Sequence, residues 1–126
     1  MTSLTTYLLV GVGGAFGAVL RFFISQLMLQ WFGKGFPFGT LLVNVLGSFL
    51  LGWVYSLTEQ GHLDIVPWRT LIAIGFLGAF TTFSTFSLDS LLLIQQGDYV
   101  KGYLNIFLNL CCCLGAAWIG LNIIKG

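Results

Sequence analysis

Four long apolar stretches separated by short polar connectors constrain this chain more than any other feature. They cover approximately residues 7–32, 38–57, 68–94 and 99–124, and the connectors are residues 33–37, 59–64 and 95–98. A helix needs about 20 apolar residues to cross the hydrocarbon core of a bilayer. We therefore expect an all-α integral membrane protein with four transmembrane helices, forming a single domain over residues 1–126.

The composition agrees with a lipid environment. Hydrophobic residues make up 57% of the chain and charged residues only 7%, whereas a soluble domain carries about 25% charged residues. A net charge of +1 provides no basic patch, so we expect no nucleic-acid partner. The first residues lack both basic side chains and an Ala-x-Ala-like cleavage site. We therefore expect the first apolar stretch to be a retained span and not a signal peptide.

Lys and Arg near the ends of the spans normally fix the orientation of a membrane protein. With four spans, Arg69 and Lys125 fall on one side of the bilayer, and Lys34, Lys101 and the deeper Arg21 fall on the other. Two basic residues on one side against three on the other set almost no preference for one orientation. The sequence therefore predicts that the chain can insert in both orientations, which would allow two copies to pack antiparallel.

Residues 75–87 form an uncharged run of aromatic and hydroxyl side chains within the third stretch, with the sequence GFLGAFTTFSTFS. Gly75 and Gly78, followed by the β-branched Thr81 and Thr82, weaken the helix there. A helix break at membrane depth is tolerated only inside protein or beside a water-filled cavity. The run therefore indicates either a break at a functional cavity or simple curvature of the helix.

Phe83 and Phe86 lie three residues apart and so share one side of a helix. The edge of a phenylalanine ring is electropositive, and two rings turned edge-on could solvate an anion. Such rings would hold the anion loosely enough for it to leave, as conduction requires. Pairs at this spacing are more often packing residues, so the spacing alone favours packing.

Several polar side chains lie within the other stretches. Asn44 carries an amide that lipid cannot satisfy, which indicates either a helix–helix hydrogen bond or an anion donor facing a pore. Asn105 and Asn109 are one helical turn apart and share a face. Arg21 lies late enough in its span to extend toward the interface, and we expect it to be an interfacial or vestibule charge.

The three cysteines predict no metal site. Cys111, Cys112 and Cys113 are consecutive, so on a helix they point about 100° apart and cannot converge on one ion. We expect them to be packing residues. Gly13 and Gly17 form a Gly-xxx-Gly pair, which lets helix backbones approach closely in lipid.

Three segments together resemble the Fluc (CrcB) family of microbial fluoride channels. They are GGAFGAVLR at residues 13–21, GTLLVN at residues 39–44 and the run at residues 75–87. The resemblance extends over nearly the whole chain, and the run at residues 75–87 is its most specific part. It implies a dual-topology homodimer of antiparallel four-helix subunits in the cell inner (plasma) membrane, with a broken third helix and two fluoride pores.

The resemblance also implies roles for single residues. Asn44 would lie in the pore, and Phe83 and Phe86 would supply the edge-on rings. Backbone carbonyls of Gly78 and Thr81 from both subunits would hold one central Na⁺ as a structural ion.

Further positions match the family in the same way. Ser84, Thr85 and Thr82 correspond to a track of hydroxyls, and Arg21 and Thr40 match the arginine and threonine of the vestibule. The chain departs from the family on the fourth helix, where Asn105 and Asn109 stand in place of a tyrosine and a serine. We assign Asn109 to the pore on this basis.

The function expected from the resemblance is passive, fluoride-selective export down the electrochemical gradient. Hydrogen fluoride enters a cell from weak acid outside and ionises in the neutral cytoplasm, so a channel would release the trapped anion. A proton-coupled antiporter is the alternative, and only Asp89 could serve as its intramembrane carboxylate. A scaffold would leave the hydroxyl run unexplained. An enzyme is not expected, since the sequence contains no nucleophile–base pair.

Overall fold

The computed structural model describes residues 3–124, which form four long helical spans. The elements are α1 (Leu4–Phe32), α2 (Phe38–Glu59), η1 (Ile65–Leu77), α3 (Gly78–Phe80), α4 (Phe83–Gln95) and α5 (Tyr99–Asn122). The helices η1, α3 and α4 together make the third span. Each of the four spans is long and apolar enough to cross a membrane, which confirms the predicted number of spans. Lys125, used above to predict orientation, lies outside the described residues.

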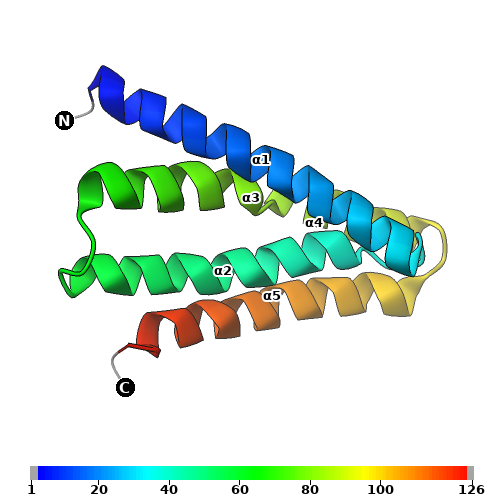
Figure 1. Ribbon diagram of the computed structural model, residues 1–126. Helices are drawn as coiled ribbons and strands as arrows, with labels where there is room; N and C mark the ends of the chain where they lie inside the picture. Colours follow the sequence, from blue (N-terminus) through cyan, green and yellow to red (C-terminus); the bar gives the residue numbers. More distant parts are fainter. Residues whose placement is uncertain (1–2, 125–126) are drawn as a thin grey trace.

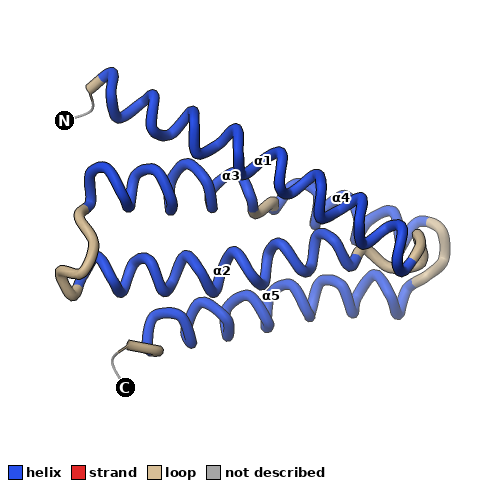
Figure 2. The backbone as a smooth tube through the Cα atoms, in the orientation of Figure 1, coloured by secondary structure: helices blue, strands red, loops and turns tan. Residues whose placement is uncertain are grey.

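The spans run up and down, so that the connections alternate between two ends of the molecule (Figure 1). The start of α1, the end of α5 and the connection from α2 to η1 lie at one end, and the other two connections lie at the opposite end (Figure 2). The helix α2 packs along α5, α1 packs against η1 and α3, and α4 packs against α5. Many large apolar side chains face outward, as a surface in contact with lipid or with a second subunit requires.

Glycines set the closest helix contacts. A Cβ atom at Gly13 or Gly17 of α1 would overlap backbone carbonyl oxygens of η1. A Cβ atom at Gly52 or Gly120 would likewise overlap the backbone across the α2–α5 contact. Because lipid offers no hydrophobic drive for helix association, such close backbone approach is one way in which the spans pack together. The Gly-xxx-Gly pair of α1 is therefore a packing contact.

The first part of the third span is wound more widely than an α-helix. In η1 the N–H of Arg69 bonds to the carbonyl of Asp64 at 3.2 Å, five residues earlier. At the other end the N–H of Gly78 reaches the carbonyl of Ala73. Bonds to the fifth preceding residue define π-helical winding, which is rare and is frequently found near functional sites.

The chain leaves helical geometry for two residues near the centre of the third span. The helix α3 ends at Phe80, and α4 begins at Phe83. Thr81 has φ −87° and ψ 159°, and Thr82 has φ −152° and ψ 120°. Both residues are therefore extended, and Figure 2 draws them as a short loop between two helices. The N–H of Thr81 still bonds to the carbonyl of Leu77 at 3.1 Å, whereas the N–H of Thr82 needs a partner other than the ordinary helical one.

Candidate functional site

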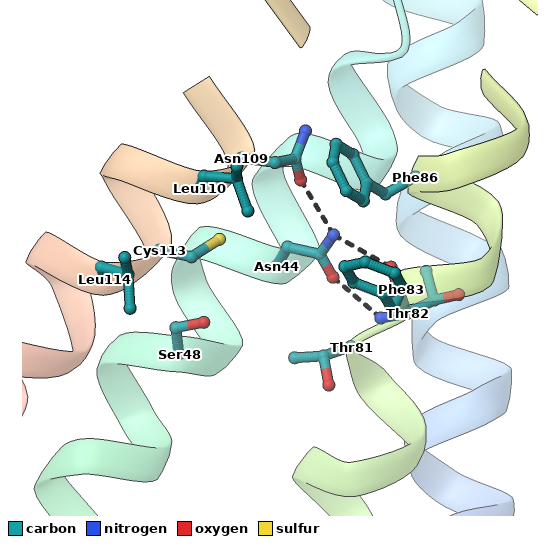
Figure 3. A pocket seen from close by; sticks show the side chains of 10 residues that line it. All are labelled: Asn44, Ser48, Thr81, Thr82, Phe83, Phe86, Asn109, Leu110, Cys113 and Leu114. Carbon is teal, nitrogen blue, oxygen red and sulfur yellow. Dashed lines mark hydrogen bonds between the residues drawn. The ribbon is translucent and has the colours of Figure 1, made fainter. Parts of the chain in front are cut away.

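A cavity of about 300 Å³ lies beside the extended pair Thr81 and Thr82. It is bounded by α2, by the start of α4 and by the middle of α5, as Figure 3 shows. Its lining residues are Asn44, Ser48, Thr81, Thr82, Phe83, Phe86, Asn109, Leu110, Cys113 and Leu114. Of the residues predicted for a pore, Asn44, Thr82, Phe83, Phe86 and Asn109 line this cavity.

The side chain of Asn44 pairs with the backbone of Thr82. The N–H of Thr82 donates to Asn44 Oδ1 at 2.8 Å, and Asn44 Nδ2 donates to the carbonyl of Thr82 at 3.1 Å. The amide thus satisfies both backbone groups of Thr82, as a neighbouring β-strand would. An extended residue inside a membrane span requires this kind of compensation. Asn44 therefore holds the interruption in place.

The same amide begins a buried chain of hydrogen bonds. Asn44 Nδ2 donates to Asn109 Oδ1 at 2.9 Å, and Asn109 Nδ2 donates to Asn105 Oδ1 at 2.9 Å. Asn105 Nδ2 donates to Ser90 Oγ at 2.9 Å, and Ser90 Oγ donates to the carbonyl of Phe86 at 2.8 Å. The chain connects α2, α5 and α4 through residues that are all buried, and Asn105 is 0% exposed.

Asn44 Nδ2 has two protons, and each has a protein acceptor in this structure. The sequence left open whether this amide joins helices or faces an ion. The structure gives it the first of these roles, since it joins α2 to the break and to α5. Its place in a pore stays a prediction, although the residue does line the cavity.

The two phenylalanines form an edge-to-face pair. The ring centroids of Phe83 and Phe86 are 5.2 Å apart, and the ring planes are inclined by 65°. Phe86 is buried, whereas Phe83 is 73% exposed in the single subunit. Both rings lie next to the Asn44 amide (Figure 3). The predicted proximity of these rings is confirmed; an anion at their edges stays a prediction.

Thr82 caps the N-terminus of α4. Its Oγ1 accepts the N–H of Thr85 at 3.2 Å and donates to Thr85 Oγ1 at 3.1 Å. A threonine is a favoured N-cap residue because its oxygen satisfies one of the free N–H groups of the first turn. The positive end of the α4 dipole consequently points to the region of the break beside the cavity.

The break also frees several carbonyl groups from their ordinary helical donors, those of Gly78 and Thr81 among them. The usual donor for the Gly78 carbonyl is the N–H of Thr82, which instead bonds to Asn44. The usual donor for the Thr81 carbonyl is the N–H of Thr85, which instead bonds to Thr82 Oγ1. These are the two carbonyls predicted to hold Na⁺. Within residues 3–124 no cluster of three or more His, Cys, Asp or Glu side chains could hold a metal ion.

Arg21 forms a hydrogen bond at the break in the third span. Its Nε donates to the carbonyl of Ala79 at 2.9 Å, at the C-terminal end of α3. A cation is stabilised there by the negative end of the helix dipole. The sequence could not reveal this partner, a carbonyl left free near the middle of the third span. The expectation that Arg21 is an interfacial or vestibule charge stays a prediction.

A second cavity, of about 220 Å³, contains Thr40, Thr85 and Asp89. Thr40 Oγ1 donates to Asp89 Oδ2 at 3.0 Å. Thr40 therefore lies with Thr85 in a cavity separate from Asn44 in the single subunit. Ser84 is not among the lining residues of either cavity; it is exposed, and its Oγ lies 3.3 Å from Thr82 Oγ1.

Sequence reasoning missed Ser48 and Ser90. Ser48 lines the first cavity, and its position four residues after Asn44 could have placed it on the same helix face. Cys113 also lines that cavity, four residues after Asn109, whereas Cys111 and Cys112 are exposed. Ser90 carries the last link of the hydrogen-bond chain, and no sequence pattern had marked it.

Comparison with known proteins now identifies the family. Residues 8–121 match the family described as CrcB-like protein, Camphor Resistance (CrcB). The chain is 55% identical over 116 residues to the fluoride-specific ion channel FluC of Pseudoalteromonas translucida, covering 92% of this chain and 97% of the relative. It is 56% identical over 117 residues to FluC of Shewanella amazonensis, covering 93% and 94%.

These relatives are named as ion channels and not as enzymes. With four helices able to span a bilayer, the protein is a multi-pass membrane protein, and in a bacterial cell such a protein resides in the inner membrane. The expectation that the chain is not an enzyme agrees with its relatives. The match over residues 8–121 and the identity to full-length relatives lead to one conclusion: the chain belongs to the CrcB family.

Proposed function

We propose that this protein is a fluoride-selective channel through which cytoplasmic fluoride leaves passively, down its electrochemical gradient. The names of relatives that are 53–56% identical over more than nine-tenths of the chain support this function. The observation that carries it is the pair of extended residues near the centre of the third span, held by Asn44 beside a cavity. A packing helix would have no need of that arrangement.

The physical task of such a channel is to replace the water around a small, strongly hydrated anion. The start of α4 supplies three kinds of electropositive group at one place. They are the N–H groups of its first turn, which have no helical acceptor, the hydroxyl of Ser84 beside Thr82, and the ring edges of Phe83 and Phe86. None of these groups carries a full charge, so the anion is not trapped.

The two cavities suggest the route of the ion. Thr40, Asn44 and Ser48 are spaced by four residues on α2 and follow one face of that helix. Thr40 and Thr85 belong to the second cavity, which serves as a vestibule leading to the first. The guanidinium of Arg21, fixed against the carbonyl of Ala79, adds a positive charge near the passage and helps to draw anions toward it.

The pore requires a second subunit. Phe83 lines the first cavity and yet is 73% exposed, so in the single chain this aromatic wall is open on one side. An antiparallel homodimer would cover it and would contain two equivalent pores related by a twofold axis. The near balance of basic residues between the two sides of the bilayer is consistent with insertion in both orientations.

One Na⁺ is proposed as a structural ion between the broken helices of the two subunits. The protein has suitable ligands for this ion. The carbonyls of Gly78 and Thr81 lack their ordinary helical donors, and carbonyl oxygens are suitable ligands for a hard cation. Two subunits would contribute four such oxygens. The ion would supply positive charge that offsets the mutual repulsion of these carbonyls.

An antiporter is less well supported. It would need Asp89 to exchange protons, and Asp89 accepts a hydrogen bond from Thr40. The relatives are named as channels, and channels need no such exchange.

The function is tested by anion efflux from liposomes reconstituted with the purified protein. Fluoride should leave quickly and chloride should not, because the groups around the cavity are arranged for a small anion. A fluoride electrode and a chloride electrode measure the two fluxes. Chloride efflux at a rate comparable with that of fluoride would refute the proposed selectivity.

The same liposomes test the ring edges. Phe86→Ile keeps an apolar side chain but removes the ring, and it should lower fluoride efflux on the order of tenfold. Phe22→Ile is the control, because Phe22 is exposed on α1 and 65% accessible, and it should leave the flux unchanged. Equal flux from Phe86→Ile and the unaltered protein would remove this ring from the pore.

Dual topology is tested by protease access to a tag joined to the C-terminus in sealed vesicles. If subunits insert in both orientations, roughly half of the tags should be cleaved from outside, because the basic residues set no preference. Complete cleavage, or complete protection that detergent relieves, would show a single orientation and exclude the antiparallel dimer.

The structural ion is tested by the melting temperature of the purified dimer. A ligand that binds only the folded assembly stabilises it by mass action, so the dimer should melt about 5 °C higher in sodium chloride than in choline chloride of equal ionic strength. Identical melting in the two salts would argue against a Na⁺ site.

A further inference from the structure

The buried hydrogen-bond chain that starts at Thr82 has a single direction. The N–H of Thr82 donates to Asn44, Asn44 donates to Asn109, and Asn109 donates to Asn105. Asn105 then donates to Ser90, and Ser90 donates to the carbonyl of Phe86. Each member accepts from the one before it and donates to the one after it.

The two ends of this chain fix the orientation of everything between them. A backbone N–H, here that of Thr82, can only donate, and a backbone carbonyl, here that of Phe86, can only accept. With both ends fixed, each amide must present its oxygen toward Thr82 and its nitrogen toward Ser90. Rotating any one amide by half a turn would bring two donors or two acceptors together at its neighbours, which is costly for buried groups.

Two members of the chain do not reach the first cavity. Asn105 is 0% exposed and Ser90 is 3% exposed, and neither is among the residues that line the cavity. They therefore act on an ion in the cavity through neighbours that line it: Asn109 and Asn44 along the chain, and Phe86, whose carbonyl accepts from Ser90. Their buried position separates them from the lining residues Asn44 and Asn109.

We propose that Ser90 and Asn105 are positioning residues that fix the direction of the Asn109 and Asn44 amides, and through them keep the Thr81–Thr82 interruption extended. Ser90 is the terminal acceptor, because its hydroxyl takes the Nδ2 proton of Asn105 while its own proton goes to Phe86. Without that oxygen, Asn105 Nδ2 loses its buried acceptor. The Asn109 and Asn44 amides then keep only their bonds to the backbone carbonyls of Asn105 and Thr82 as fixed anchors, so the Thr82 amide is held less firmly.

The test compares two serines of α4 that make the same local bond. Ser90 donates to Phe86, and Ser87 Oγ donates to the carbonyl of Phe83 at 2.9 Å. Each bond joins a serine to the carbonyl four residues earlier, but only Ser90 also accepts from an asparagine. Ser90→Ala removes the end of the chain, and Ser87→Ala is its matched control.

The first readout is hydrogen–deuterium exchange of the peptide that covers residues 78–86 in the purified dimer. Ser90→Ala should speed the exchange of the Thr82 amide, because Asn44 no longer holds it, whereas Ser87→Ala should leave it unchanged. Asn105→Leu should act like Ser90→Ala. Exchange that is the same in Ser90→Ala and the unaltered protein would overturn the proposal.

The second readout is fluoride efflux per reconstituted dimer, and this part rests on the proposed function. Ser90→Ala should reduce the flux by about tenfold through the loss of one buried partner, and Ser87→Ala should not. The double variant Ser90→Ala/Asn105→Leu should be no worse than the poorer single variant, since both interrupt one chain. If the loss of flux in the double variant equals the sum of the two single losses, Ser90 and Asn105 do not act through one hydrogen-bond chain.

The exchange and flux measurements test the positioning role of Ser90 and the proposed function separately. If the unaltered protein carries no fluoride, the proposed function fails, while the exchange measurement still decides whether Ser90 positions Thr82. If fluoride passes normally through Ser90→Ala, the predicted effect of Ser90 on conduction is wrong and the proposed function stands, and the exchange measurement again decides whether Ser90 positions Thr82. A variant that loses the dimer on size-exclusion chromatography is replaced by Ser90→Cys, which restores a weaker donor and acceptor and should give intermediate exchange.

Discussion

The pairing of the Asn44 amide with the backbone of Thr82 is the interaction on which the rest of the site depends. Each unsatisfied backbone group in an apolar medium costs about 2–7 kcal/mol, and two extended residues near the centre of a membrane span would leave several such groups exposed. Asn44 satisfies the N–H and the carbonyl of Thr82 together. With that cost offset, the chain can leave helical geometry at the point where α4 begins.

Several features follow from this one interruption. It ends α3 with carbonyls freed from their usual donors, and Arg21 occupies one of them, that of Ala79. It starts α4 with a capped, electropositive N-terminus beside a cavity. One break thus places cation-attracting carbonyls and anion-attracting N–H groups close together, and it does so without placing a full charge within the run at residues 75–87.

The sequence predicted the four spans well, because hydropathy over about 20 residues is a direct consequence of bilayer thickness. It also brought Phe83, Phe86 and Asn44 forward as candidates, and they do lie around one cavity. It could not predict the partner of Arg21 or the role of Ser90. Both depend on which atoms α1, α4 and α5 bring together across the fold, and no spacing within a single helix contains that information. The resemblance set Asn105 and Asn109 against a tyrosine and a serine of the family, but it did not indicate the buried hydrogen bonds that these two amides make.

The most direct test of the role of Asn44 is the fluoride efflux of Asn44→Asp in liposomes. Aspartate has nearly the same shape and can still accept the N–H of Thr82, but it lacks the two protons given to Thr82 and Asn109, and it presents negative charge to the cavity. Asn122→Asp is the control, since among residues 3–124 the Asn122 amide donates within α5, to the carbonyl of Trp118. We expect Asn44→Asp to lower fluoride efflux by at least about tenfold while Asn122→Asp keeps it. Unchanged efflux from a dimeric Asn44→Asp protein would contradict the central role of this amide.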